Sequence, residues 1–276
     1  MIRSGDEVSR TFRGTVLEDL PVRQGDGDVL LVTGVPPARV LEYWGAARQV
    51  LPLTGRWPVA IAPEWSSGFS TISRDQLVEL EAEVLAMDDS RVFARWVNES
   101  PTSQRDWHRY LETYFPGAGL PAAMAVELPE PVLDDDVDRW IHERVTDSAP
   151  LLVPAEQTQA HISRQDWYQP DSVDLALLPT TSPWMAGAWL EYFGAESDGV
   201  AFIAALQRWN VRWDAELVAS WGTMLQFTVG RRPQPGEEAW ELAGQLLAWG
   251  GSLQMNQWQL AFVLARIDTW FLHDRP

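Results

Sequence analysis

The sequence contains no cysteine and no lysine. Without cysteine there is no disulfide, no thiolate metal ligand and no cysteine nucleophile. All 21 basic residues are arginine, which we interpret as the codon bias of a GC-rich genome rather than as a functional signal. Long apolar runs are also missing, so we expect no signal peptide in residues 1–7 and no membrane-spanning helix. A cytoplasmic location is therefore the expectation.

Common catalytic motifs are missing as well. No Gly-x-Ser-x-Gly elbow of a serine hydrolase occurs. The pair His142 and Glu143 begins like a zinc-protease motif, but Thr146 stands where the second histidine belongs. His108 and Glu112 lie one helical turn apart and suit two metal ligands or an acid–base pair, yet no third ligand is visible and an exposed polar face is the better interpretation. We therefore predict no cofactor and no metal site.

Negative charge is what the sequence has in excess. It holds 39 acidic and 21 basic residues, a formal net charge of −18. Residues 1–181 hold 29 acidic and 15 basic residues, against ten and six in residues 182–276. Such a field repels nucleic acid and anionic membranes, because both are bound through Lys and Arg. It attracts a basic protein, and ordinary solubility is the alternative explanation.

The densest acidic run comprises Asp134, Asp135, Asp136 and Asp138, at the start of a helix predicted over residues 134–144. Carboxylate oxygens could bind a hard cation. However, the dipole of a helix favours negative charge at its N-terminus without any metal. We interpret the run as a helix start that is also a candidate contact for a basic partner.

Sixteen tryptophans are many for 276 residues. Packing in the core and at its rim is the first explanation for large aromatic side chains, and a sticky surface for a partner is the alternative. The turn before Trp184 is the position of most interest, because Trp184, Trp189 and Tyr192 could together form an aromatic rim. A continuous exposed patch would favour partner binding, and burial of each ring would remove the site. Trp184 and Trp189 are therefore candidate partner contacts.

Hydrophobic periodicity predicts an acidic N-terminal α/β region over residues 1–146. Apolar runs at 29–32 and 57–62 predict two strands with a helix between them, a β-α-β unit without the glycines of a phosphate loop. Ser73 and Gln76 mark the start of a helix over residues 73–87. Further helices are predicted at 91–98, 103–114 and 134–144. Prolines and glycines break the pattern at 116–134, and residues 3–28 are polar with a turn at their end.

An irregular connection is predicted over residues 147–172, followed by a second domain over residues 173–276. A strand at 173–178 opens this domain. The elements expected next are a helix capped by Asp198, a hairpin over 216–229 with one buried and one solvated face, helices over 235–250 and 256–267, and a strand over 269–272. The tail reads α-β-β-α-α-β. The whole chain is therefore expected to be α+β, or mixed α/β.

The C-terminal hundred residues also resemble a known family. The run LLPTTSPWMAGAWLEYFG, then LQRWNVRWDAELVASWGTMLQFTV, an acidic helix and a terminal DTWFLHD are similar to the domain shared by bacterial proteins of domain-of-unknown-function family 4253. The upstream AARQVLPLTGRWPVAIAP resembles the part that often precedes it. Gly250 and Gly251 stand where the family pattern leads us to expect Cys-Pro, so no thiol acts there. The resemblance implies a fold and a bacterial origin, and no activity.

Two functions follow as hypotheses. The first is a non-catalytic protein-binding protein, of immunity or antitoxin type, that masks a basic partner. The rival is an enzyme with a site between the two domains, in which His108 or His142 acts with nearby carboxylates. A deep cleft where a histidine and a carboxylate converge would favour the enzyme, and scattered histidines would count against it. A scaffold or oligomerisation module is a third possibility, and the sequence does not predict the oligomeric state.

Overall fold

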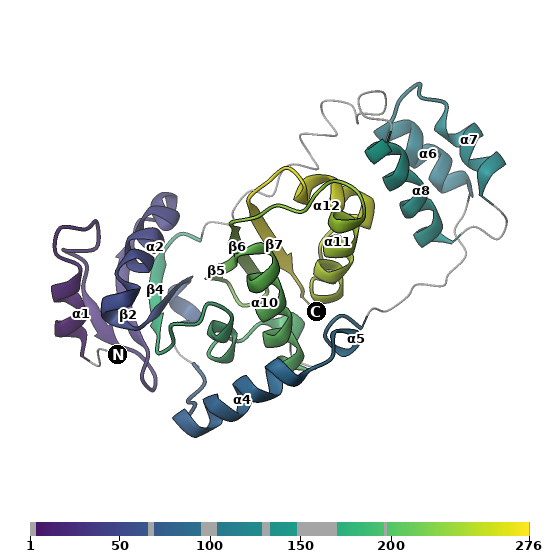
Figure 1. Ribbon diagram of the computed structural model, residues 1–276. Helices are drawn as coiled ribbons and strands as arrows, with labels where there is room; N and C mark the ends of the chain where they lie inside the picture. Colours follow the sequence, from purple (N-terminus) through teal and green to yellow (C-terminus); the bar gives the residue numbers. More distant parts are fainter. Residues whose placement is uncertain are drawn as a thin grey trace.

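The computed structural model describes residues 4–65, 69–94, 104–128, 133–147, 170–195 and 198–275. The described strands form a seven-stranded mixed sheet in the order β1-β2-β4-β3-β5-β6-β7, with helices packed around it (Figure 1). This confirms the predicted mixed α+β class. No described helix combines the length and the apolar character needed to cross a bilayer.

The sheet joins strands from both ends of the chain. Its strands are β1 Val22–Gln24, β2 Leu30–Val35, β3 Trp57–Ile61, β4 Val173–Leu178, β5 Ala215–Ser220, β6 Met224–Val229 and β7 Thr269–His273. Strand β4 lies between β2 and β3 and is antiparallel to both, so β2 and β3 run parallel to each other. Every residue of β4 is buried, as expected of a strand covered on both faces. The sheet is thus continuous across the predicted boundary at residue 172, and the division into domains stays a prediction.

The described helices pack on this sheet or on one another. They are α1 Gly5–Thr11, α2 Val40–Gln49, α3 Leu51–Thr54, α4 Arg74–Ala86, α5 Asp89–Val92, α6 Gln104–Tyr114, α7 Leu120–Glu127, α8 Asp134–Asp147, α10 Gly199–Trp213, α11 Glu237–Trp249 and α12 Gln257–Leu264. Short 3₁₀ helices occupy Pro37–Arg39 (η1), Pro63–Trp65 (η2), Trp184–Ala188 (η3) and Phe193–Ala195 (η4). The predicted caps are confirmed: the Asp198 carboxylate accepts from the Ala201 N–H at 3.0 Å, and Ser73 with Gln76 forms a capping box.

Two local predictions were wrong, and one segment holds elements for which no prediction was made. Helix α7 forms inside the stretch thought too rich in proline, because Pro121 falls in its first turn, where the missing N–H costs little. The polar segment before residue 28 holds α1 and β1. Helix α5 begins and ends earlier than predicted, and residues 95–98 of that prediction lie outside the described part of the chain.

The hairpin of β5 and β6 has no solvated face at Gln226, contrary to expectation. Gln226 is 1% exposed, and its side-chain carbonyl accepts a hydrogen bond of 2.8 Å from the Trp221 indole N–H. Strand β6 is flanked by β5 and β7, so a polar side chain at this position needs a partner inside the protein. Period-two alternation predicted the strand correctly but not its environment.

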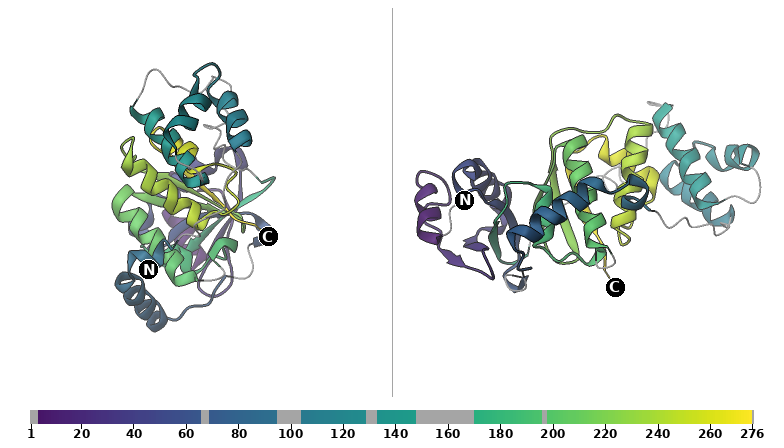
Figure 2. Two further views of the ribbon diagram at one scale, coloured as in Figure 1. Left: turned by 90° about the vertical axis from the view of Figure 1, so that its right-hand side faces the viewer. Right: turned by 60° about the horizontal axis from the view of Figure 1, so that its bottom comes forward.

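Buried apolar side chains form two clusters. The larger cluster is formed by side chains of the sheet packed against side chains of α2 and α10. The smaller joins α6, α7 and α8 to α12, with Trp258 of α12 completely buried among them. Helices α6–α8 lie at one end of an elongated molecule, and α1 and β1 lie at the other (Figure 2). The helical group is thus attached to the rest of the chain through α11 and α12.

Candidate functional site

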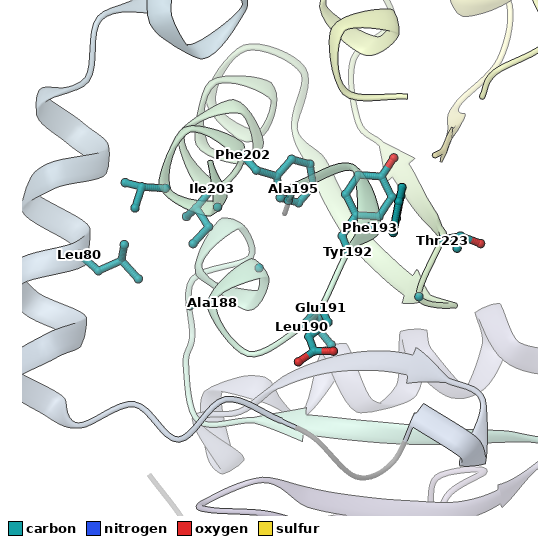
Figure 3. A pocket seen from close by; sticks show the side chains of 14 residues that line it. Leu80, Ala188, Leu190, Glu191, Tyr192, Phe193, Ala195, Phe202, Ile203 and Thr223 are labelled. Atoms are coloured by element: carbon teal, nitrogen blue, oxygen red, sulfur yellow. The ribbon is translucent and has the colours of Figure 1, made fainter. Parts of the chain in front are cut away.

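A groove with a volume of about 650 Å³ opens between α4, α10 and the segment that links β4 to α10. Phe202 and Ile203 of α10 form part of its floor, and Leu190 of the linking segment also belongs to its lining. Leu80 of α4 faces them from the opposite wall (Figure 3). The lining is therefore mainly apolar and comes from elements far apart in the sequence.

Small residues create this groove. Gly187, Ala188, Ala195, Gly199 and Gly222 all belong to its lining. A Cβ at Gly187 would lie 2.8 Å from a methyl group of Leu206, so η3 approaches α10 closely only because this residue is glycine. A Cβ at Gly199 would meet nothing within 4 Å. The floor is therefore tightly packed, and the mouth near the start of α10 is open.

Polar groups are few in the groove. Glu191 is exposed at its rim and Thr223 lies at the turn between β5 and β6. The Tyr192 hydroxyl donates a hydrogen bond of 2.7 Å to the Trp249 carbonyl, and burial raises the pKa of Tyr192. The described residues that line the groove include no histidine. Its geometry therefore offers binding surface and no imidazole–carboxylate pair.

The wall formed by α4 is rich in carboxylates. Residues 69–94 hold six acidic and two basic residues, and the four acidic side chains of α4 are all exposed: Asp75, Glu79, Glu81 and Glu83. Val84 is the one fully buried residue of this helix, although Leu77 and Leu80 pack partly against the core. An amphipathic helix normally covers its apolar stripe more completely. The groove thus has an apolar floor, and the helix that contributes Leu80 to its lining carries exposed carboxylates nearby in the sequence.

Arginines hold the C-terminal end of α4 against α10. The Arg208 guanidinium donates to the carbonyls of Val84 at 3.1 Å and Met87 at 2.5 Å, and to the Asp89 carboxylate at 3.0 Å. Beyond α4, Arg91 of α5 pairs with Asp198 at 2.8 Å. These contacts fix one end of the wall, while its N-terminal half contacts the core through Leu77 and Leu80.

The helix cap of Asp198 shapes the open mouth of the groove. The Ala201 N–H, followed by the Arg91 side chain, lowers the pKa of this carboxylate, which therefore stays ionised. The cap fixes where α10 begins and so places Gly199 and Val200 at the mouth. The predicted N-cap is thus also a positioning element of the groove.

The predicted acidic run lies elsewhere, on α8. Asp138 is buried, and its carboxylate accepts from the Asn256 side-chain amide at 3.0 Å and from the Gln257 N–H at 2.8 Å. It therefore caps the start of α12 from a distant part of the chain. Asp134 accepts from the Trp107 indole N–H at 3.0 Å.

The other two members of the run differ in exposure. Asp136 is exposed and accepts from the Leu133 N–H at the start of its own helix, and Asp135 is half-buried. Partner binding at the four aspartates stays a prediction. The contacts of Asp134 and Asp138 give these two residues a definite role in joining helices.

The aromatic residues near the turn do not form a continuous exposed rim. Trp189 is 2% exposed and Tyr192 is 4% exposed, while Trp184 is half-buried against the core. Trp189 and Tyr192 therefore support the fold, and Tyr192 also lines the groove. Contact of Trp184 and Trp189 with a partner stays a prediction.

The candidate histidines lie away from the groove. His142 of α8 is buried, with its Nε2 3.1 Å from the Gly236 carbonyl and its ring 5.0 Å from the Trp240 ring. Burial lowers the pKa of His142. His108 of α6 has a buried Nε2 without a hydrogen-bond partner among the described residues, and Glu112 is exposed. Within the described ranges, no three His, Cys, Asp or Glu residues lie close enough together to hold a metal.

Sequence reasoning missed the groove, although it predicted the helices on its two sides. Leu80 lies on the helix predicted over residues 73–87, and Phe202 lies on the helix predicted to be capped by Asp198. What the sequence did not show is that these two helices stand side by side with glycine and alanine between them. The sequence feature that could have indicated the groove was the apolar stripe of α4, which consists of few residues.

Residues 174–274 match the model of the family described as Domain of unknown function (DUF4253). The matched region runs from β4 to β7 and includes η3 and α10, whereas α4 lies outside it. No curated protein and no solved structure matches the chain.

Proposed function

Starting from a C-terminal domain without an assigned activity, we propose that this protein is a non-catalytic protein-binding protein that masks a basic partner, in the manner of an immunity protein or antitoxin. The observation that carries the proposal is the apolar groove beside α10, with the carboxylate-rich α4 as its wall. A partner segment with apolar and cationic side chains would complement both features.

The apolar floor supplies the reason for binding. Apolar hollows with a polar rim are typical of interaction sites on soluble proteins, and the volume of this one falls within the usual range of ligand pockets. Leu80, Leu190 and Val200 in the lining are only partly covered. Burying a large apolar side chain completely contributes about 1.5–3 kcal/mol, so a partner that covers these residues gains affinity from them.

The negative charges near the groove favour a partner with basic side chains. Glu79 and Glu83 lie one helical turn apart with Leu80 between them in sequence, and Glu191 lies at the rim. Opposite charges across an interface accelerate association and discriminate against wrong partners more than they add affinity. The net charge of −18 extends the same effect over a longer range. Association should therefore slow as salt is added.

The test compares two matched variants as bait. Phenylalanine at position 199 would enter the open mouth of the groove, because nothing lies within 4 Å of a Cβ there. Gly45→Phe on α2 is the control, since a Cβ at Gly45 also meets nothing within 4 Å and this residue is not part of the groove.

We expect the wild type and Gly45→Phe to retain the same basic protein from cells of the native host at low salt, and Gly199→Phe to lose it. At about 0.5 M salt the Debye length is only a few ångströms, so the attraction between opposite charges is screened. The retained complex should therefore weaken. Equal retention by all three baits, or a partner that is not basic, would overturn the proposal.

A further inference from the structure

We infer that the segment bound in the groove is an amphipathic α-helix with a basic polar face, rather than an extended peptide. This inference rests on the proposed function, because it specifies the partner of the same groove. The walls of the groove decide between the two backbone conformations, and the charges around it decide the polar face.

The groove presents few main-chain groups to an extended peptide. Its lining comes from α4, α10 and η3, from residues 190–195 between η3 and α10, and from the turn between β5 and β6. Within the helices, N–H and C=O groups are bonded to their own helix. In the linking segment, the Ala195 N–H donates to the Tyr192 carbonyl at 2.9 Å. At the turn between β5 and β6, the Gly222 carbonyl accepts from the Phe193 N–H at 3.1 Å, and the Thr223 carbonyl accepts from the Asp274 N–H at 3.0 Å. The edge strands of the sheet, β1 and β7, do not line the groove.

An extended segment would therefore bury unpaired backbone groups. Extended peptides usually bind by adding a strand to a sheet edge, where each main-chain group finds a partner. A helix satisfies its own N–H and C=O groups and brings only side chains to the surface it contacts. In an apolar groove that no edge strand lines, the helix is the conformation without a desolvation penalty on the backbone.

The side chains of the groove fit one face of such a helix. Apolar residues at positions i, i+3, i+4 and i+7 form a stripe, which would lie on Leu80, Phe202 and Ile203 between α4 and α10. The flanks of the same helix would then pass Glu191, which lines the groove, and α4, whose Glu79 is exposed next to Leu80 in the sequence. Arginine or lysine on these flanks completes the match.

Three synthetic peptides test the inference by fluorescence anisotropy. The first is a probe of about 16 residues, or four to five turns, with leucine at the helical stripe positions and lysine elsewhere. The second has the same leucines and lysines in strict alternation, so that its amphipathic form is a strand. The third keeps the helical pattern and carries glutamate in place of lysine.

We expect the first peptide to bind the wild-type protein at least about tenfold more tightly than either of the others, a difference of about 1.4 kcal/mol. The helical circular-dichroism signal of the mixture of peptide and protein should exceed the sum of the signals of the two components measured separately. Gly199→Phe should lose this binding and Gly45→Phe should keep it. Thermal unfolding of both variants checks that they are folded, and Glu191→Arg at the exposed rim provides a second way to weaken the complex.

The outcomes separate the inference from the proposed function. If the alternating peptide binds as tightly as the helical one and Gly199→Phe blocks both, the groove binds basic segments but not as helices, and the inference alone is wrong. If both basic peptides bind wild type and Gly199→Phe equally, the groove is not their site and the proposed function fails as well. Tight binding of the glutamate peptide would overturn the charge assignment.

Discussion

Helices α4 and α8 are both rich in carboxylates and both pack on other helices of the protein, yet they use their charges differently. On α8, Asp138 is buried and caps α12, and Asp134 bonds a tryptophan. On α4, the carboxylates, among them Glu79 and Glu83, are exposed on the helix that contributes Leu80 to an apolar groove. A run of acidic residues can therefore serve to join the chain's own helices or to present charge to a partner, and burial distinguishes the two.

The largest expected effect concerns the buried charge of α8. Asp138→Ala should lower the free energy of unfolding by about 3 kcal/mol, because two donors at the start of α12 lose a charged acceptor. Asp136→Ala, at an exposed position on the same helix, is the matched control and should cost less than about 1 kcal/mol. Urea unfolding of both variants measures the difference. Equal losses would show that the contacts of Asp138 do not anchor α8.

A pH effect of intermediate size is expected from His142. Burial lowers its pKa in the folded protein below the value of about 6.5 that applies when unfolded. The unfolded chain then binds the proton more readily, so this stability is fully present above pH 6.5 and is lost as the pH falls toward the folded pKa. The loss reaches at most about 1.4 kcal/mol one pH unit below 6.5.

The charged groups that face His142 are Arg139, Glu143 and Glu237. Arg139 lowers the pKa of His142, whereas the two glutamates raise it. Urea unfolding at pH 7.5 and 5.5 should show a smaller pH dependence for His142→Gln than for the wild type. The same slope in both proteins would mean that His142 does not contribute to it.

The groove wall gives a smaller effect on binding. Leu80→Ala should weaken binding of the basic helical peptide about fivefold, or about 1 kcal/mol, because it removes partly buried apolar surface that the peptide would cover. Val78→Ala on the same helix is the control, since Val78 is 61% exposed and does not line the groove. Titration of both variants with the peptide makes the comparison. A larger loss for Val78→Ala would place the contact on the outer face of α4.

The smallest effect should separate the two acidic helices by kinetics. Glu79→Gln with Glu83→Gln, and Asp135→Asn with Asp136→Asn, remove the same charge from α4 and from α8. The first pair should lower the association rate of the basic peptide at low salt by about twofold to threefold, and the second should leave it nearly unchanged. Stopped-flow mixing gives both rates. If only the double variant of α8 associated more slowly, the binding site would lie at the acidic run of α8.

Local signals in the sequence predicted much of the fold. The caps at Ser73 and Asp198 were correct because a capping side chain bonds backbone only three residues away. Periodicity likewise predicted α10, α11 and the hairpin of β5 and β6. These elements depend on interactions between near neighbours in the chain.

Long-range contacts escaped prediction for a physical reason. The insertion of β4 between β2 and β3, and the capping of α12 by Asp138, join segments more than a hundred residues apart. The same aspartate spacing fits a solvated helix start and a buried cap equally well. The groove is of this kind too, because it exists only where α4, η3 and α10 come together.

Hydrogen exchange followed by mass spectrometry, with and without the basic helical peptide, tests the central claim most directly. Binding in the groove should slow exchange in peptides covering α4 and the start of α10, residues 74–86 and 199–206, and leave α8 at residues 134–147 unchanged. Protection of α8 without protection of α4 would contradict the claim and assign the partner surface to the other acidic helix.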